Sequence, residues 1–106
     1  MEKKLRILGI DPGTTVTGYG LVETGGSKPV ILTLGIMRPG KFDDHYQRLK
    51  YLHERALAII DEFRPDVMAL EAPFYGKNVQ SMLKLGRAQG VLMAAGLYRS
   101  LPIFEY

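Results

Sequence analysis

The sequence predicts an α/β protein built on a five-stranded mixed sheet, with the element order βββαβαβ and helices packed on the faces of the sheet. Three observations support this prediction. Three apolar segments follow one another with short turns between them, two later segments have the apolar spacing of amphipathic helices, and each helix leads into a further short apolar run. Strands that are joined through a helix pair in parallel, so the sheet combines parallel and antiparallel neighbours.

The first three strands are predicted to form an antiparallel meander. Residues 5–11 read as a strand with the sequence LRILGID. The turn residues after it, at 12–15, lead into a second strand over 16–24. A glycine-rich turn at 25–28 then leads into a third strand over 30–36. Because turns this short join antiparallel neighbours, the three strands are expected to lie side by side in chain order.

Two helices and two more strands are predicted in the rest of the chain. Apolar residues recur at spacings of three and four over 43–64, which is typical of an amphipathic helix that ends before Pro65. The short run 67–70 is the fourth strand. A second helix is predicted over 78–99, and 101–106 are expected to form the fifth strand, parallel to the fourth.

Composition limits the class of protein. A chain of 106 residues with a formal net charge of +3 fits one small globular domain, residues 1–106. The absence of cysteine excludes a disulfide framework and thiolate metal sites. No apolar stretch reaches the ~20 residues of a membrane span and the amino terminus lacks a secretory core, so we expect a cytoplasmic protein without a membrane partner. The slight excess of basic residues permits an anionic partner.

Two acidic residues stand directly at the exits of apolar strands. Asp11 ends the first strand, and Glu71 follows the fourth. Such apolar runs are typical of strands covered on both faces, where a charge must be compensated by a shared proton, a basic side chain or a divalent cation. A carboxylate site without histidine or cysteine nearby favours Mg²⁺, with Mn²⁺ as a substitute. Alternatively, Asp11 caps the turn that follows it. Small residues two positions earlier, Gly9 and Ala69, leave room beside each acid.

A pair of carboxylates that binds metal has a definite chemical use. Two divalent cations can activate water on one side of a phosphodiester and stabilise the departing oxygen on the other. Two acids are few for such a site, and Glu105 near the end of the fifth strand is the only other acid expected to approach the same edge.

The segment after Glu71 carries candidates for nucleic-acid binding. Phe74 and Tyr75 either stack on unpaired bases or pack as loop aromatics against the sheet. Lys77, Lys84 and Arg87 fall within one angular sector of the second helix and form either a phosphate-binding stripe or an ordinary solvated face.

The second helix also carries two glycines, and two histidines precede it in the chain. Gly86 and Gly90 allow another helix to approach closely, and that helix belongs either to this chain or to a second subunit. We interpret His45 and His53 as surface or helix-packing residues.

Several motifs together make the chain similar to a known family. They are Gly9-Ile10-Asp11-Pro12-Gly13-Thr14, Val16-Thr17-Gly18-Tyr19-Gly20, Leu70-Glu71-Ala72-Pro73-Phe74 with Lys77-Asn78, Leu83-Lys84-Leu85-Gly86-Arg87-Ala88-Gln89-Gly90, and Leu101-Pro102-Ile103-Phe104-Glu105-Tyr106. From residue 5 to residue 106 the chain resembles the RuvC family of bacterial Holliday junction resolvases, which have the RNase H-like fold.

This resemblance implies a function and a set of site residues. Asp11 and Glu71 would be the first two catalytic carboxylates and would bind Mg²⁺, while Phe74 would engage bases at the centre of a four-way DNA junction. Tyr75, Lys77, Asn78, Lys84 and Arg87 are the further DNA-binding candidates. The resemblance also implies a homodimer that nicks opposed strands symmetrically in recombination and repair, and cooperation with a branch-migration motor. The family continues into a final helix with two more catalytic acids, so the resemblance implies that this chain is incomplete at its carboxyl end.

Two other functions fit parts of the sequence. A non-catalytic fragment for DNA binding or dimerisation is compatible with the missing acids. The segment 9–15 is also similar to the phosphate-binding hairpin of actin-like and sugar-kinase ATPases, although 106 residues leave no room for the second lobe of those enzymes.

Overall fold

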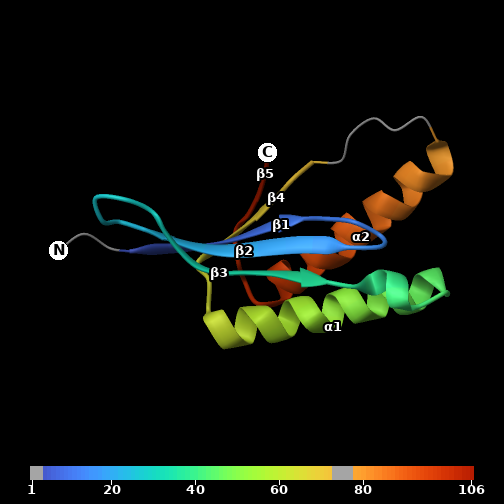
Figure 1. Ribbon diagram of the computed structural model, residues 1–106, viewed down its shortest axis with the longest axis horizontal. Helices are drawn as coiled ribbons and strands as arrows, with labels where there is room; N and C mark the ends of the chain where they lie inside the picture. The colour runs from blue at the N-terminus through green and yellow to red at the C-terminus, as the bar shows by residue number, and fades with distance from the viewer. Residues whose placement is uncertain (1–3, 73–77) are drawn as a thin grey trace.

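The computed structural model describes residues 4–72 and 78–106, and these form a twisted five-stranded sheet with two long helices (Figure 1). The strands and helices follow the predicted order. The strands are β1 Leu5–Asp11, β2 Thr17–Thr24, β3 Val30–Met37, β4 Val67–Leu70 and β5 Ile103–Glu105, and the helices are α1 His45–Phe63 and α2 Val79–Tyr98. A short 3₁₀ helix, η1 Pro39–Lys41, was not predicted.

The sheet has the strand order β3-β2-β1-β4-β5, which places β1 at its centre. β1, β2 and β3 pair antiparallel and β4 pairs parallel to β5, as predicted, and β4 also pairs parallel to β1. In the β1–β4 register Ile10 lies opposite Leu70, and the amide of Glu71 donates to the Ile10 carbonyl at 3.0 Å. The two strands therefore end at the same edge of the sheet.

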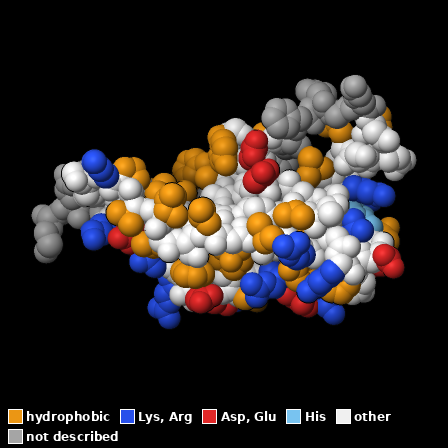
Figure 2. Space-filling model, in the orientation of Figure 1, with side chains coloured by type: hydrophobic (Ala, Val, Ile, Leu, Met, Phe, Trp, Pro, Cys, Tyr) orange, Lys and Arg blue, Asp and Glu red, His pale blue; other side chains and the backbone are white. Residues whose placement is uncertain are grey.

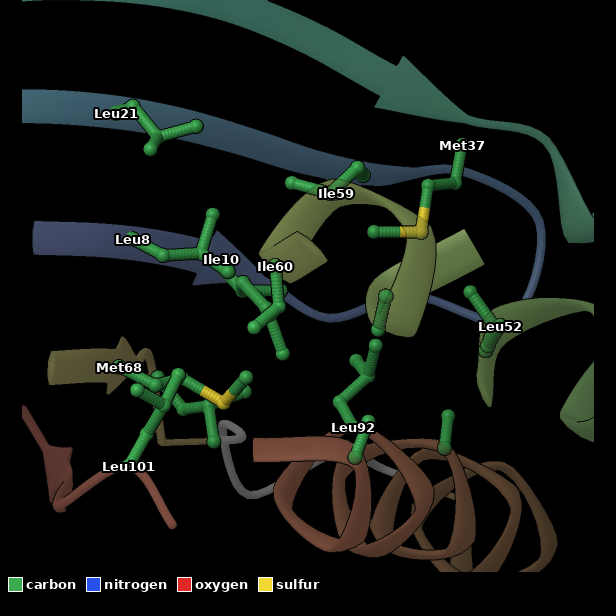
Figure 3. Close-up of a cluster of buried hydrophobic side chains, with 14 residues drawn as sticks. Leu8, Ile10, Leu21, Met37, Leu52, Ile59, Ile60, Met68, Leu92 and Leu101 are labelled. Atoms are coloured by element: carbon green, nitrogen blue, oxygen red, sulfur yellow. The ribbon is translucent and has the colours of Figure 1, made fainter. Parts of the chain in front are cut away.

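Both helices pack against the same face of the sheet. Their buried residues and the buried side chains of β1, β2 and β4 form one hydrophobic cluster (Figure 3). Its fully buried members include Leu8, Leu21, Leu52, Met68 and Leu92. The fold class is as predicted, but the expectation that β1 is covered on both faces does not hold for the described residues, because an apolar run alone does not say which side of a strand a helix reaches.

Local capping explains where the helices begin and end. The Asp44 carboxylate accepts from the amide of Gln47 at 2.9 Å at the start of α1. That helix ends where Arg64 takes a left-handed conformation, φ 49°, just before the buried Pro65. Asn78 caps α2 in the same way as Asp44 caps α1. No described helix is long and apolar enough to cross a bilayer.

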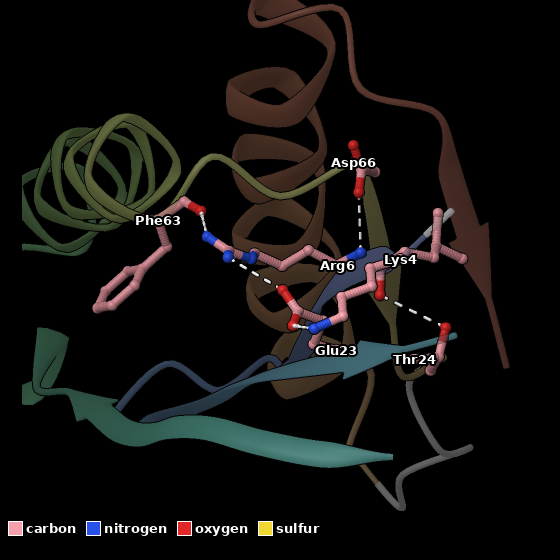
Figure 4. A network of polar contacts seen from close by, with 7 residues as sticks. Lys4, Arg6, Glu23, Thr24, Phe63 and Asp66 are labelled. Atoms are coloured by element: carbon pink, nitrogen blue, oxygen red, sulfur yellow. Dashed lines mark hydrogen bonds and ion pairs between the residues drawn. The ribbon is translucent and has the colours of Figure 1, made fainter. Parts of the chain in front are cut away.

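A polar network fastens the sheet at the end of β1 opposite Asp11 (Figure 4). The guanidinium of Arg6 donates to the Phe63 carbonyl at 2.6 Å and to Glu23 Oε2 at 3.0 Å, and its amide donates to Asp66 Oδ2 at 2.8 Å. Arg6 thus joins β1 to β2, to the end of α1 and to the start of β4. This anchoring fixes β4 beside β1 and hence the position at which Glu71 leaves the sheet.

Candidate active site

Asp11 and Glu71 lie close together at the shared carboxyl ends of β1 and β4. A hydrogen bond with Asp11 raises the pKa of Glu71 above its ordinary value, and the negative charge of Asp11 and desolvation act in the same direction. Two carboxyl groups this close disfavour the ionised form of Glu71, and a cation bound between them would remove that effect. The sequence prediction that these acids share one edge is consistent with this arrangement.

The turn after Asp11 is held by side chains other than Asp11. Thr17 is fully buried, and its hydroxyl accepts from the Gly13 amide at 3.0 Å and donates to the Gly13 carbonyl at 2.9 Å. A Cβ on Gly13 would stand 2.1 Å from the Val16 carbonyl oxygen, so only glycine fits there. Thr17 therefore holds the turn at Gly13, which leaves the Asp11 carboxylate available for Glu71.

Two contacts tie this turn to α1 and η1. Arg48 of α1 donates through Nη1 to the Thr14 carbonyl at 3.1 Å and through Nε to the Phe42 carbonyl at 2.6 Å. The amide of Gly40 donates to the Thr15 carbonyl at 3.0 Å. The loop that carries Asp11 is thus braced from two directions. Arg48 was not predicted as a site residue, because no short-range pattern reveals a partner so distant in the chain.

Glu71 is supported from α2 and from the carboxyl end of the described chain. Gln89, only 9% exposed, reaches the Glu71 carbonyl with its side-chain amide at 3.5 Å. The Ala72 amide donates to the Tyr106 carbonyl at 2.8 Å, which extends the pairing of β4 and β5 past Glu71. Gln89 was not predicted either, although a polar residue on the apolar side of a helix is a signal that could have found it.

Glu105 does not join the acid pair. In the β4–β5 register it lies opposite Leu70, whose buried side chain faces the helices. Since side chains alternate between the faces of a strand, Glu105 lies on the opposite face from Glu71. Glu105 therefore reaches the edge of the sheet that the sequence predicted, but its position in the strand register keeps it off the face that carries the acid pair.

The sheet face on the Asp11 side is open in the described structure. A shallow depression of 440 Å³ lies over β1 and β2, and its lining includes Asp11, Tyr106 and three glycines. The glycines are Gly9, Gly18 and Gly20. Because these glycines have no side chains, the depression stays open as far as Asp11, and a ligand can approach Asp11 over this face.

The structure describes three of the six predicted DNA-binding residues. Lys84 and Arg87 are exposed on α2. The Asn78 side chain caps α2, its oxygen accepting from the amides of Gln80 and Ser81 at 2.8 and 3.3 Å. The remaining three candidates, Phe74, Tyr75 and Lys77, lie outside the described residues.

The donor set suits a hard divalent cation but is small. Within residues 4–72 and 78–106, no group of three or more His, Cys, Asp or Glu side chains is placed to hold a metal ion. Asp11 and Glu71 offer carboxylate oxygens only, and their closeness raises the pKa of Glu71, which a bound cation would reverse. Mg²⁺ commonly uses one or two protein carboxylates and completes its shell with water and substrate phosphate. The residues present therefore fit such an ion.

Known structures resemble this fold over nearly the whole chain. The structure described as T. thermophilus RuvC in complex with Holliday junction substrate has a TM-score of 0.86 and 26% identity, and the match covers 96% of this chain and 64% of that chain. The Aquifex aeolicus PPX-GPPA enzyme has a TM-score of 0.58 at 12% identity, over 98% of this chain and 36% of that one. The second likeness concerns the fold alone.

Sequence comparison identifies the family. A relative from Bacteroides fragilis named Crossover junction endodeoxyribonuclease RuvC is 58% identical over 104 residues, which are 98% of this chain and 55% of the relative. The chain spans about half the length of the curated relatives that it matches. The family model described as Crossover junction endodeoxyribonuclease RuvC matches residues 7–106. The chain therefore belongs to the RuvC family of crossover junction endodeoxyribonucleases.

Proposed function

We propose that residues 1–106 form the RNase H-like nuclease domain of a structure-selective DNA endonuclease, which resolves four-way junctions by phosphodiester hydrolysis in recombination and repair. The observation that carries this proposal is the acid pair at the exits of two adjacent parallel strands, Asp11 and Glu71, in a chain of this family. Such a substrate places the protein in the cytoplasm.

Asp11 and Glu71 would hold the catalytic Mg²⁺, for which Mn²⁺ is a possible substitute. A bound cation would lower the pKa of an attacking water and stabilise the departing oxygen. The protein's own part is to present both carboxylates ionised and fixed in place. The contacts of Thr17 and Arg48 do this for the Asp11 turn, and Gln89 does it for the strand end at Glu71.

The DNA is proposed to reach the acids along the start of α2. Lys84 and Arg87 would contact backbone phosphates, since both are exposed cations on the helix that supports Glu71. Phe74 and Tyr75 would stack on unpaired bases, and Lys77 and Asn78 would add polar contacts. Of these, Asn78 retains only its side-chain amide nitrogen for DNA, because its oxygen caps the helix.

We propose that the active protein is a homodimer that pairs through α2, so that two identical sites face the two-fold junction. The outward side of this helix carries the exposed residues Leu83 and Leu97, at 50% and 62% exposure. A Cβ on Gly86 or Gly90 would meet nothing within 4 Å, so these glycines do not serve the packing of α2 on the described part of the chain. A second copy of α2 can approach closely there. A branch-migration motor is the further partner that the resemblance implies.

Cleavage is proposed to need more than the two acids in this chain. The resemblance implies two further carboxylates in a helix after Tyr106, and the matched relatives are about twice as long. We therefore expect residues 1–106 to supply half of the metal ligands and the core of the fold. Extension to the length of the relatives should restore Mg²⁺-dependent nicking.

The test compares the extended protein with its Asp11→Asn and Glu71→Gln variants on a four-way junction and a duplex of equal length. Paired symmetric nicks that need Mg²⁺ and vanish in both variants support the proposal, whereas an extended protein that binds junction no better than duplex contradicts it. A protein that binds junctions with steep salt dependence but never cleaves would instead be a DNA-binding or dimerisation module. Measurable ATP binding would favour the actin-like alternative.

A further inference from the structure

A group of basic side chains gathers where α1 and α2 begin, apart from the acid pair. His45 and Arg48 come from α1, and Lys84 and Arg87 come from α2. The charges of Arg87, Lys84 and Arg48 all act on the His45 ring, and the two helices that carry these residues pack against each other. Figure 2 shows Lys and Arg side chains next to a histidine ring at the right-hand end of the molecule, where Figure 1 places the starts of both helices.

His45 is poorly satisfied in this setting. Its Nε2 atom is shielded from solvent and has no hydrogen-bond partner among the described residues. Desolvation lowers the pKa of His45 below its ordinary value, and the charges of Arg87, Lys84 and Arg48 lower it further. Only Asp44 acts in the opposite direction, and its carboxylate already accepts from the Gln47 amide at 2.9 Å. Among the described residues, His45 Nε2 therefore has no hydrogen-bond partner, and the ring stands in a positive field.

None of the ion pairs in the described part of the chain includes a member of this group. In the described part of the chain the ion pairs involve other acids and bases, namely Lys4 and Arg6 with Glu23, Lys50 with Glu54, and Arg99 with Asp61. Lys84 and Arg87 are exposed and take part in none of them. Three uncompensated cations around one histidine repel one another, and a bound anion would relieve that repulsion.

The position of Arg48 relates this group to the acid pair. Its guanidinium is held by the Phe42 and Thr14 carbonyls, at 2.6 and 3.1 Å, so it is oriented before any ligand arrives. Thr14 belongs to the turn that follows Asp11. A DNA strand that lies across the acids can therefore place a neighbouring phosphate on this group.

We propose that His45, Arg48, Lys84 and Arg87 form a phosphate-binding subsite that takes a backbone phosphate of the DNA junction, with proton uptake by His45 on binding. The inference rests on the proposed function and adds a contact from α1 to it. A phosphate oxygen supplies the hydrogen-bond acceptor that the protonated ring needs, and its negative charge reverses the field of the three cations.

Because proton uptake by His45 is coupled to phosphate binding, the pH dependence of junction affinity tests this subsite. If the phosphate raises the pKa of His45, junction affinity must increase as the pH falls, by about tenfold for every pH unit that separates the bound from the free pKa. Lys84→Gln and Arg87→Gln should each weaken binding and reduce the slope of affinity against salt by about one. His45→Gln keeps a polar side chain but cannot take up a proton.

The experiment follows the ring signals of His45 and His53 by NMR while the pH is varied, first in the free protein and then with four-way junction DNA or inorganic phosphate. His53, further along α1, is the internal control. We expect the junction to raise the pKa of His45 and not that of His53, and we expect His45→Gln, unlike His53→Gln, to abolish most of the pH dependence of binding.

Three other results would contradict the inference, and they distinguish failure of the subsite from failure of the proposed function. Junction binding with an unmoved His45 and an unaltered His45→Gln variant would refute the subsite and leave the proposed function intact. A change in the His45 titration caused by inorganic phosphate but not by DNA would show that the site takes a small anion rather than the junction. Absence of any junction binding by the extended protein would refute both the subsite and the proposed function.

Discussion

The bracing of the Asp11 turn by Arg48 gives a prediction whose size follows from the structure. Arg48→Gln removes a half-buried guanidinium that donates to the Phe42 carbonyl at 2.6 Å and to the Thr14 carbonyl at 3.1 Å. A hydrogen bond to a charged group contributes about 1.5 to 3 kcal/mol. Water can replace part of each lost contact, so we expect the free energy of unfolding to fall by about 2 kcal/mol for the pair.

Thermal unfolding followed by circular dichroism measures this effect. A loss of that size should lower Tm by roughly 8 to 16 °C in a domain of this length. Arg55→Gln is the matched control, since Arg55 lies exposed on the same helix, and it should change stability by less than about 0.5 kcal/mol. The Arg48 variant should also bind Mn²⁺ more weakly, because the Asp11 turn loses its anchor. Equal melting temperatures for the two variants would refute the bracing role of Arg48.

Three further predictions concern stability. Arg6→Met should lower the free energy of unfolding by about 2 kcal/mol, measured by urea titration, because it leaves Glu23 without its close ion-pair partner at 3.0 Å and removes the link to α1. The pKa of His45 in the folded state lies below the ordinary 6.5, so the wild type loses stability as the pH falls below 6.5. His45→Gln should make this loss of stability smaller. Equal pH profiles of stability for the variant and the wild type would contradict this prediction. Leu92→Ala, at a fully buried position, should lower the free energy of unfolding by about 2 to 5 kcal/mol in the same titration, and an unchanged stability would contradict this.

The positions of the two acids followed from local patterns in the sequence. Apolar runs that end in Asp11 and precede Glu71 identify two strands, and a helix between strands implies a parallel neighbour. Since parallel strands end at the same edge, the approach of the two carboxylates needed only that β1 and β4 be adjacent, and in the structure they are. The three-strand meander and both helices were predictable for the same reason, because each depends on spacing and turn residues within a few positions.

What the sequence did not reveal depends on contacts between distant residues. Glu105 lies on the opposite face of the sheet from Asp11 and Glu71. A shift of one residue in strand pairing would move every side chain of β5 to the other face, and no local signal in the sequence sets that pairing. Both helices pack on one face because α1 and α2 bury their apolar sides against each other as well as against the sheet. Arg48 and Gln89 reach the site across the fold, so their roles are visible only once the helices are placed.

Carbon-13 NMR of the Glu71 carboxyl group measures whether Asp11 and Glu71 share a cation site. We expect a pKa above the ordinary 4.5 in the metal-free protein, a return toward 4.5 in Asp11→Asn, and a fall below the metal-free value when Mg²⁺ is added to the wild type. Glu105→Gln should leave the titration unchanged, since that side chain lies on the other face. A Glu71 pKa that responds neither to Asp11→Asn nor to Mg²⁺ would show that the two carboxylates do not share a cation site.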